Sequence, residues 1–202
     1  GAAICGWLLL QPKTGSIADI AASIFGLFYL GFLPSHWIKL RNLTSFDLAT
    51  GFSSATNNPS YYSIGMAITL STCLMIVACD IGSYVFGRLC GKNSLSPISP
   101  SKTIEGAIGG LLSAIVVGAI SGMCFEWKMG FFIGALLGAL VAFFSLVGDL
   151  TESMMKRDAG IKDSGDVLPG HGGILDRIDS YVFTPAIVYY VLILIIPVIS
   201  SK

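Results

Sequence analysis

Residues 129–149 read MGFFIGALLGALVAFFSLVGD, an apolar stretch that carries no charge before its final aspartate. An α-helix rises about 1.5 Å per residue, so about 20 apolar residues cross the hydrocarbon core of a bilayer. We therefore predict a membrane span over residues 129–148, with Asp149 at its end. This stretch indicates a helical membrane protein rather than a water-soluble fold.

Further apolar stretches lie on both sides of this one. They predict spans over residues 17–33, 61–82, 104–125 and 180–200, and the residues before Pro12 are expected to end another span. The pairs Gly118-x-x-x-Gly122 and Gly134-x-x-x-Gly138 are typical of closely packed membrane helices. The expected fold is all-α, a polytopic transmembrane helix bundle of about five spans plus a partial N-terminal one.

The composition agrees with this fold. Of 202 residues, 53% are hydrophobic and 12% are charged, whereas a soluble domain carries about 25% charged residues. Basic and acidic residues number 12 each, so there is no global basic field and nucleic-acid binding is not expected. The chain opens inside an apolar run without an initiator Met, and we interpret this start as the cut end of a longer chain.

Alternating connections must face opposite sides of the membrane. One face holds residues 83–103 and 149–179, with seven basic residues: Arg88, Lys92, Lys102, Lys156, Arg157, Lys162 and Arg177. The other face holds four: Lys39, Arg41, Lys128 and Lys202. The positive-inside rule predicts that the first face is cytoplasmic or its topological equivalent. His36 and Trp37, on the other face, are expected to lie at the membrane interface.

Acidic residues also gather at span ends on the first face, namely Asp80, Glu105, Asp149, Asp176 and Asp179. The segment 149–179 alone contains 7 acidic and 4 basic residues. If the helix continues past Asp149, one helix face presents Asp149, Glu152, Ser153 and Lys156. Acids in a membrane protein tend to be functional, so this face is the predicted site.

The same face carries groups that suit phosphate chemistry. Residues 169–173, Pro-Gly-His-Gly-Gly, predict a tight turn with exposed backbone N–H groups. Oxygen ligands without nitrogen or sulfur favour hard cations such as Mg²⁺. Clustered Lys and Arg side chains suit phosphate oxygens. Together these features indicate phosphoryl or nucleotidyl transfer at a membrane surface.

Several blocks of this face also match a known family. They are Ser153-x-x-Lys156-Arg157, Lys162-Asp163, Leu168-Pro169-x-His171-Gly172-Gly173, Asp176-Arg177-x-Asp179, Gly148-Asp149-Leu150-x-Glu152, Ser99-Pro100-x-Lys102-Thr103-x-Glu105-Gly106 and Asp80-x-x-x-Tyr84-x-x-Gly87-Arg88. Residues 60–200 thereby resemble the CDP-diacylglycerol synthases (phosphatidate cytidylyltransferases), and residues 148–181 are most similar to cyanobacterial and plastid members. Ser83 and Arg88 stand where Ala and Lys are common, and residues 34–60 match no block of that family.

The resemblance implies a reaction in which CTP and phosphatidic acid give CDP-diacylglycerol and pyrophosphate, within a lipid bilayer. It implies Mg²⁺ on Asp149 and Asp176, a second cation such as K⁺, and a homodimer. The catalytic residues would be Asp149, Asp176, Lys156, Arg157, Lys162 and Arg177. The substrate-binding residues would be Asp80, Ser99, Lys102, Glu105, Ser153, His171, Gly172, Gly173 and Asp179. For His171, a phosphate contact and a hydrogen bond within its own turn both stay open.

The implied organisation is an N-terminal part, residues 1–60, and a catalytic transmembrane domain, residues 61–202. The implied location is a bacterial inner membrane or a plastid or other organelle membrane. Two other functions remain open. Acids near spans also mark the ion paths of ion-coupled transporters, although those sites lie near the midplane. Another lipid-linked phosphotransferase is the second alternative, although the dense Asp-Gly-x-x-Ala-Arg motif of CDP-alcohol phosphotransferases is missing from this sequence.

Overall fold

Membrane-crossing helices dominate the computed structural model, which describes residues 6, 16–43, 64–96, 99–124, 130–165 and 172–195. Within these ranges, five helical segments are long and apolar enough to span a membrane: Ile17–Arg41, Ile64–Cys90, Ile104–Cys124, Gly130–Asp158 and Leu175–Leu194. The five predicted spans are confirmed. The partial span before Pro12 and the turn at residues 126–128 lie outside the described residues.

The helices do not end where the apolar stretches end. Helix α4 (Ile64–Cys90) and helix α6 (Gly130–Asp158) continue well past the predicted ends at residues 82 and 148, and α7 (Leu175–Tyr190) begins before residue 180. Helical hydrogen bonding extends through polar sequence, whereas hydropathy registers only the part suited to hydrocarbon. The predicted boundaries are therefore corrected, and the extra turns of α4, α6 and α7 carry charged side chains.

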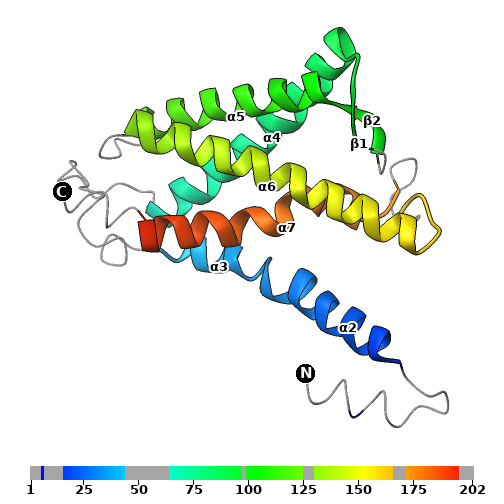
Figure 1. The fold of residues 1–202 in the computed structure, drawn as a ribbon. Coiled ribbons are helices and arrows are strands. Elements are labelled where there is room, and N and C mark those ends of the chain that lie inside the picture. The colour runs from blue at the N-terminus through cyan, green and yellow to red at the C-terminus, as the bar shows by residue number, and fades with distance from the viewer. Residues whose placement is uncertain are drawn as a thin grey trace.

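A small β hairpin occupies part of the connection over residues 83–103. Strands β1 (Ser94–Ser96) and β2 (Ser99–Thr103) pair antiparallel, and α5 (Ile104–Cys124) follows directly. Figure 1 shows the hairpin, the end of α6 and the start of α7 at the same end of the bundle. This hairpin is an addition to the expected all-helical architecture.

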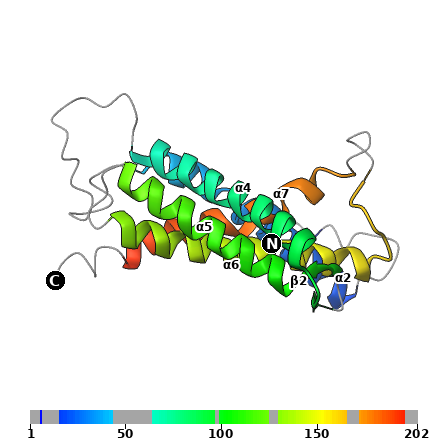
Figure 2. The same cartoon turned by 90° about the horizontal axis from the view of Figure 1, so that it is seen from above.

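Glycines hold α5 and α6 in backbone contact. A Cβ atom at Gly118 would overlap the carbonyl oxygen of Gly134, and one at Gly122 would overlap that of Gly130. Lipid tails are as apolar as the helix surfaces, so the hydrophobic effect does not drive helices together in a membrane. They associate through such close packing instead. The predicted role of the small-residue pairs is confirmed, and Figure 2 shows α4, α5 and α6 extending side by side.

The main core lies where α4, α6 and α7 meet. It contains the buried side chains of Ile68, Met75, Ile76, Leu137, Val141, Val188 and Leu192. Many large apolar side chains on the outer faces are instead exposed, as expected where lipid replaces water. The core thus fixes α6 against α7, the helices that carry Asp149, Asp176 and Asp179.

Only the beginning of the first span lies apart from this bundle, because Leu40, near the end of the span, belongs to the main core. The parts of the span are α2 (Ile17–Gly26), a π-helical segment η1 (Leu27–Phe32) and α3 (His36–Arg41), and α2 projects away from the other helices in Figure 1. Helix α2 begins at a capping box, in which the Asp19 N–H donates to the Ser16 hydroxyl oxygen (3.2 Å) and the Ser16 N–H donates to the Asp19 carboxylate (2.7 Å). A second π-helical segment, η2 (Val191–Ile195), continues α7.

A proline in α7 anchors the first span. Pro185 has no N–H, so the carbonyl of Tyr181, one turn earlier, has no helical donor. The Trp37 indole N–H donates to that carbonyl at 3.1 Å. His36 is fully buried and contacts the rings of Tyr189 and Tyr190. α7 covers His36, and the expected place of His36 and Trp37 at the membrane interface stays a prediction.

Candidate active site

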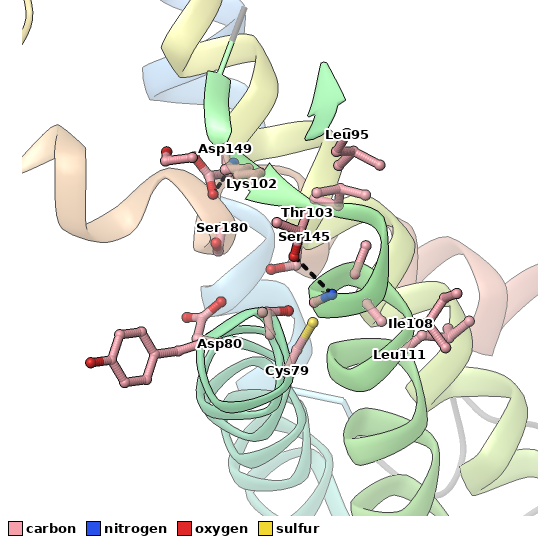
Figure 3. A pocket seen from close by; sticks show the side chains of 18 of the residues that line it. Cys79, Asp80, Leu95, Lys102, Thr103, Ile108, Leu111, Ser145, Asp149 and Ser180 are labelled. Atoms are coloured by element: carbon pink, nitrogen blue, oxygen red, sulfur yellow. Dashed lines mark hydrogen bonds and ion pairs between the residues drawn. The ribbon is translucent and has the colours of Figure 1, made fainter. Parts of the chain in front are cut away.

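A pocket opens where the hairpin meets the polar ends of α4 to α7. Its volume is about 790 Å³, within the range of ligand sites. Its polar lining includes Asp80, Tyr84, Arg88, Lys102, Asp149, Asp176, Arg177 and Asp179. Its apolar lining includes Ile108, Leu111, Ala142, Phe143 and Leu146. Figure 3 shows how the polar and apolar side chains meet around this space.

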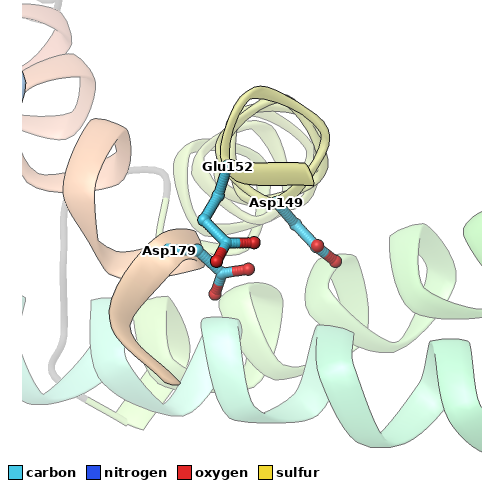
Figure 4. Close-up of side chains that lie close together, drawn as sticks. All are labelled: Asp149, Glu152 and Asp179. Carbon is cyan, nitrogen blue, oxygen red and sulfur yellow. The ribbon is translucent and has the colours of Figure 1, made fainter. Parts of the chain in front are cut away.

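Three carboxylates converge beside the pocket. Asp149 and Glu152 lie three residues apart on α6, and Asp179 reaches them from α7. One ligand oxygen of each lies within 4.8 Å of the others. Figure 4 shows the carboxylates of Glu152 and Asp179 side by side, with Asp149 next to Glu152 on the same helix. We call Asp149, Glu152 and Asp179 the acidic cluster.

Close helix packing brings the acidic cluster together. Gly148 immediately precedes Asp149, and a Cβ atom at Gly148 would overlap the carbonyl oxygen of Asp179. The missing side chain lets the start of α7 approach α6 at that level. The helical period then places Glu152 on the same face as Asp149. The predicted shared face of α6 is confirmed as far as these two residues.

Lysines flank the acidic cluster on both sides. Lys102 of β2 forms an ion pair with Asp149, and the Lys156 ammonium donates to Glu152 at 2.8 Å. Lys156 also donates to Asp176 at 2.7 Å. Two unit charges about 5 Å apart repel by roughly 3 kcal/mol at an effective dielectric constant near 20, so neighbouring cations are needed to keep three carboxylates ionised.

Asp176 has a different environment from the acidic cluster. Besides Lys156, its carboxylate accepts from the Ser164 N–H and hydroxyl, both at 2.9 Å, and from the Gly173 N–H at 2.8 Å. Gly172 has φ near +75°, a conformation that favours glycine, and a Cβ there would lie 3.0 Å from the carboxylate. Asp176 therefore fastens the end of the 161–165 segment to the turn that begins α7.

Glu105 also has a local structural role. Its carboxylate accepts from the backbone N–H groups of Lys92 and Asn93, at 3.2 and 3.3 Å, and from the Asn93 side chain at 2.9 Å. These bonds close the hairpin over the start of α5. They fix the strand that presents Lys102 to Asp149. Glu105 thus positions the hairpin in this structure.

The remaining predicted residues divide by their place around the pocket. Those that line it are Asp80, Lys102, Asp149, Asp176, Arg177 and Asp179. Those outside the described lining are Ser99, Glu105, Ser153, Lys156, Arg157, Lys162, Gly172 and Gly173. Arg157 and Lys162 are exposed, and Ser153 is half-buried on α6. His171 lies outside the described residues, so both of its roles stay predictions.

Glu152 lies on the predicted face of α6, but the sequence predicted no catalytic, substrate-binding or metal role for it. Its side chain is 1% exposed, and its Oε1 atom has no hydrogen-bond partner within the described ranges. Its three-residue spacing from Asp149 was the available signal, since the two were expected on one helix face. Burial singles it out, and burial depends on the packing of α7.

The donor atoms of the acidic cluster show whether it suits a cation. All three donors are carboxylates, which suit Mg²⁺ or another hard cation. The unpartnered Glu152 oxygen is a buried acceptor, and buried acceptors normally have a partner. The donor set therefore fits a divalent cation.

The sequence matches known proteins along nearly its whole length. Residues 2–195 match the cytidylyltransferase family. The chain is 47% identical over its whole length to the phosphatidate cytidylyltransferase of Synechocystis, of which it spans 71%. This chain belongs to the phosphatidate cytidylyltransferase family. It is also 42% identical to chloroplastic phosphatidate cytidylyltransferase 4 of Arabidopsis thaliana over 90% of its length.

The family match extends to more distant relatives. The Bacillus subtilis phosphatidate cytidylyltransferase is 32% identical over 93% of the chain. The chain spans 64% of that relative and 48% of the chloroplastic one, so both are longer. The predicted resemblance to cyanobacterial and plastid members is confirmed. With five apolar spans among the residues that the structure describes, this family member is an integral membrane protein.

Proposed function

We propose that this chain transfers CMP from CTP to phosphatidic acid, giving CDP-diacylglycerol and pyrophosphate. The observation that carries the proposal is the acidic cluster at the wall of a pocket that also holds Lys102, Arg88 and Arg177. Carboxylates for a cation and bases for phosphates at one membrane-facing pocket suit nucleotidyl transfer. Family membership supports the same reaction.

In this reaction a phosphate oxygen of phosphatidic acid bonds to the α-phosphorus of CTP. The bond from that phosphorus to the bridging oxygen of the β-phosphate breaks, and pyrophosphate leaves. The nucleophile is already an anion, so no side chain has to remove a proton from an alcohol. Catalysis therefore depends on positioning two anions and neutralising their charge.

The residues of the pocket have separate tasks in this proposal. Asp149, Glu152 and Asp179 would hold Mg²⁺, which when bound would neutralise and orient CTP phosphates. Lys102 and Arg177 would contact phosphate oxygens from the hairpin and from α7. The sequence predicted Asp176 as the second Mg²⁺ ligand beside Asp149. In this structure Asp176 bonds to Lys156 and to the Gly173 N–H, and its metal role stays a prediction.

The apolar part of the pocket suits the lipid substrate. Ile108 and Phe143 line it, yet they are 53% and 58% exposed on the outer surface of α5 and α6. The pocket thus reaches a face that lipid would cover. Phosphatidic acid could keep its acyl chains in the bilayer while its phosphate reaches Lys102. We propose that this end of the bundle faces the cytoplasm or its equivalent, in line with its excess of basic residues.

The test uses purified protein in nanodiscs that contain phosphatidic acid, with radiolabelled CTP and varied Mg²⁺. We expect CDP-diacylglycerol and pyrophosphate in equal amounts, formed only with Mg²⁺. Asp149→Asn should abolish the product while thermal unfolding stays near that of wild type. Asp158→Asn, at the exposed end of α6, is the matched control.

Two results would overturn the proposal. One is full activity of Asp149→Asn, which would overturn the cation site proposed for Asp149. The other is no product from the wild-type chain together with either nucleotide-independent ion uptake into vesicles or transfer from CDP-diacylglycerol to an alcohol. Those activities would identify a transporter or another phosphotransferase. Comparing Asp176→Asn with Asp179→Asn in a Mg²⁺ titration separates the two ligand assignments.

A further inference from the structure

A buried phenol hydroxyl lies on the first span with no hydrogen-bond partner. Tyr29 is 1% exposed, and its hydroxyl oxygen contacts no donor or acceptor among the residues that the structure describes. Its ring stacks on Phe25 (5.4 Å between centroids) and meets the edge of Phe183 (5.6 Å). Apolar packing thus holds the ring, but the hydroxyl needs another explanation.

This hydroxyl lies near the acidic cluster. Val182 of α7, in the same buried cluster as Tyr29, lies one helical turn after Asp179, and Met155 of α6, packed against that cluster, lies one turn after Glu152. Glu152 has the matching unsatisfied acceptor, because its Oε1 atom is also buried and has no hydrogen-bond partner among the described residues. A donor without an acceptor and an acceptor without a donor therefore lie in the same region. Buried groups of this kind usually bond to each other or to an ordered water.

The first span is anchored firmly enough to place this hydroxyl. Trp37 bonds to the Tyr181 carbonyl at 3.1 Å, and Tyr29 packs with Val182 and Ala186 of α7. Tyr29 also belongs to the π-helical segment η1, a geometry that is frequent at functional sites. A phenylalanine would satisfy the apolar packing alone. The hydroxyl is thus the part of Tyr29 that the packing does not require.

Resting on the proposed function, we propose that Tyr29 is a positioning residue of the acidic cluster. Its hydroxyl donates to Glu152 Oε1, directly or through one water, when a divalent cation occupies the cluster. The bond orients the Glu152 carboxylate, whose other oxygen accepts from Lys156. It also couples the seating of the first span on α7 to cation binding. Partners beyond the direct ligands commonly tune metal affinity in this way.

The test compares Tyr29→Phe with wild type in a cation titration without substrates. The readout is the thermal unfolding midpoint of the purified chain as Mg²⁺ or Mn²⁺ is added. Tyr29→Phe should need about tenfold more cation for half of the stabilisation, the lower end of the usual effect of such partners. Tyr190→Phe is the matched control, because it removes a phenol hydroxyl from the part of α7 that packs on His36.

A double-mutant cycle links the effect to Glu152. If the two groups bond, adding Tyr29→Phe to Glu152→Gln should weaken cation binding by far less than tenfold. The proposal is overturned by a Tyr29→Phe titration that coincides with wild type. It is also overturned by a midpoint lowered equally at every cation concentration, or by a variant that does not fold, since both indicate a purely structural role.

These results are separable from a failure of the proposed function. Wild-type chain that forms CDP-diacylglycerol, with an unchanged Tyr29→Phe titration, removes only the role of Tyr29. Wild-type chain that forms no product and is not stabilised by either cation removes the proposed function and this inference with it.

Discussion

Lys102 of the β hairpin forms an ion pair with Asp149 at the end of α6. The pair joins two segments that are 47 residues apart in the sequence numbering. It also joins the two kinds of group that the proposed reaction needs, a base for phosphate and a carboxylate for a cation. On binding, a substrate phosphate would replace Asp149 as the partner of Lys102, and the cation would replace Lys102 as the partner of Asp149.

Replacing Lys102 should separate these two roles. Lys102→Ala should lower kcat/KM for CTP roughly 10- to 100-fold, the usual cost of a lost charged hydrogen bond. The same variant should bind Mg²⁺ more tightly in the absence of nucleotide, because Lys102 no longer competes for Asp149. Steady-state kinetics and a cation titration by thermal shift measure the two effects.

Lys92→Ala is the control for this experiment, since Lys92 is exposed and lies outside the described pocket lining. It should keep near-wild-type kinetics. An unchanged kcat/KM in Lys102→Ala would show that the ion pair serves only to hold the hairpin.

The second prediction concerns Gly148, which allows the close approach of α7 to α6 at the acidic cluster. Gly148→Ala would force the new methyl group against the Asp179 carbonyl and move the start of α7. We expect at least tenfold weaker Mg²⁺ binding and a similar loss of activity, since ligand geometry would be lost. Gly31→Ala is matched in chemistry and has open space around it, so it should be silent. Equal behaviour of the two variants would contradict the proposed packing role.

The sequence predicted what depends on local pattern. Hydropathy located all five spans, and the helical period placed Asp149 and Glu152 on one face. Hydropathy did not give the extra turns of α4 and α6, because those turns lie beyond the apolar stretch. The hairpin was missed for a related reason, since its short strands carry mostly small polar residues.

The contacts missed by sequence analysis are non-local. Glu152 is buried beside Asp179 of α7, and the place of Tyr29 depends on how the first span docks on that helix. The bond from Trp37 to the Tyr181 carbonyl follows from Pro185, but a proline alone does not say which donor will use the freed carbonyl. Asp176 was expected beside a metal, and its bonds to Ser164 and Gly173 depend on how these two residues meet at the start of α7.

Replacing Lys156 should lower the stability of the fold as well as the catalytic activity. It is the donor shared by Glu152, which is 1% exposed, and Asp176, which is 12% exposed. Lys156→Met would leave the buried Glu152 carboxylate without its charge partner, and breaking such a pair costs about 3 kcal/mol. The apparent unfolding temperature in mild detergent should fall clearly. Lys162→Met, at an exposed position, should leave it nearly unchanged, and equal temperatures for both would argue against a structural role of Lys156.

Labelling can test which parts of the chain share a membrane side. In a background without the native cysteines, Lys92→Cys and Lys162→Cys should react with a membrane-impermeant maleimide from the same side of sealed vesicles. Asn42→Cys, exposed after α3 and one span removed from the hairpin, should react only from the opposite side. The expectation follows because α4 and α6 each end where the acidic cluster gathers, whereas α3 ends near the start of α4. Opposite labelling of positions 92 and 162 would place the hairpin and the end of α6 on different sides. The pocket could not then form as proposed, because Lys102 would be unable to reach Asp149.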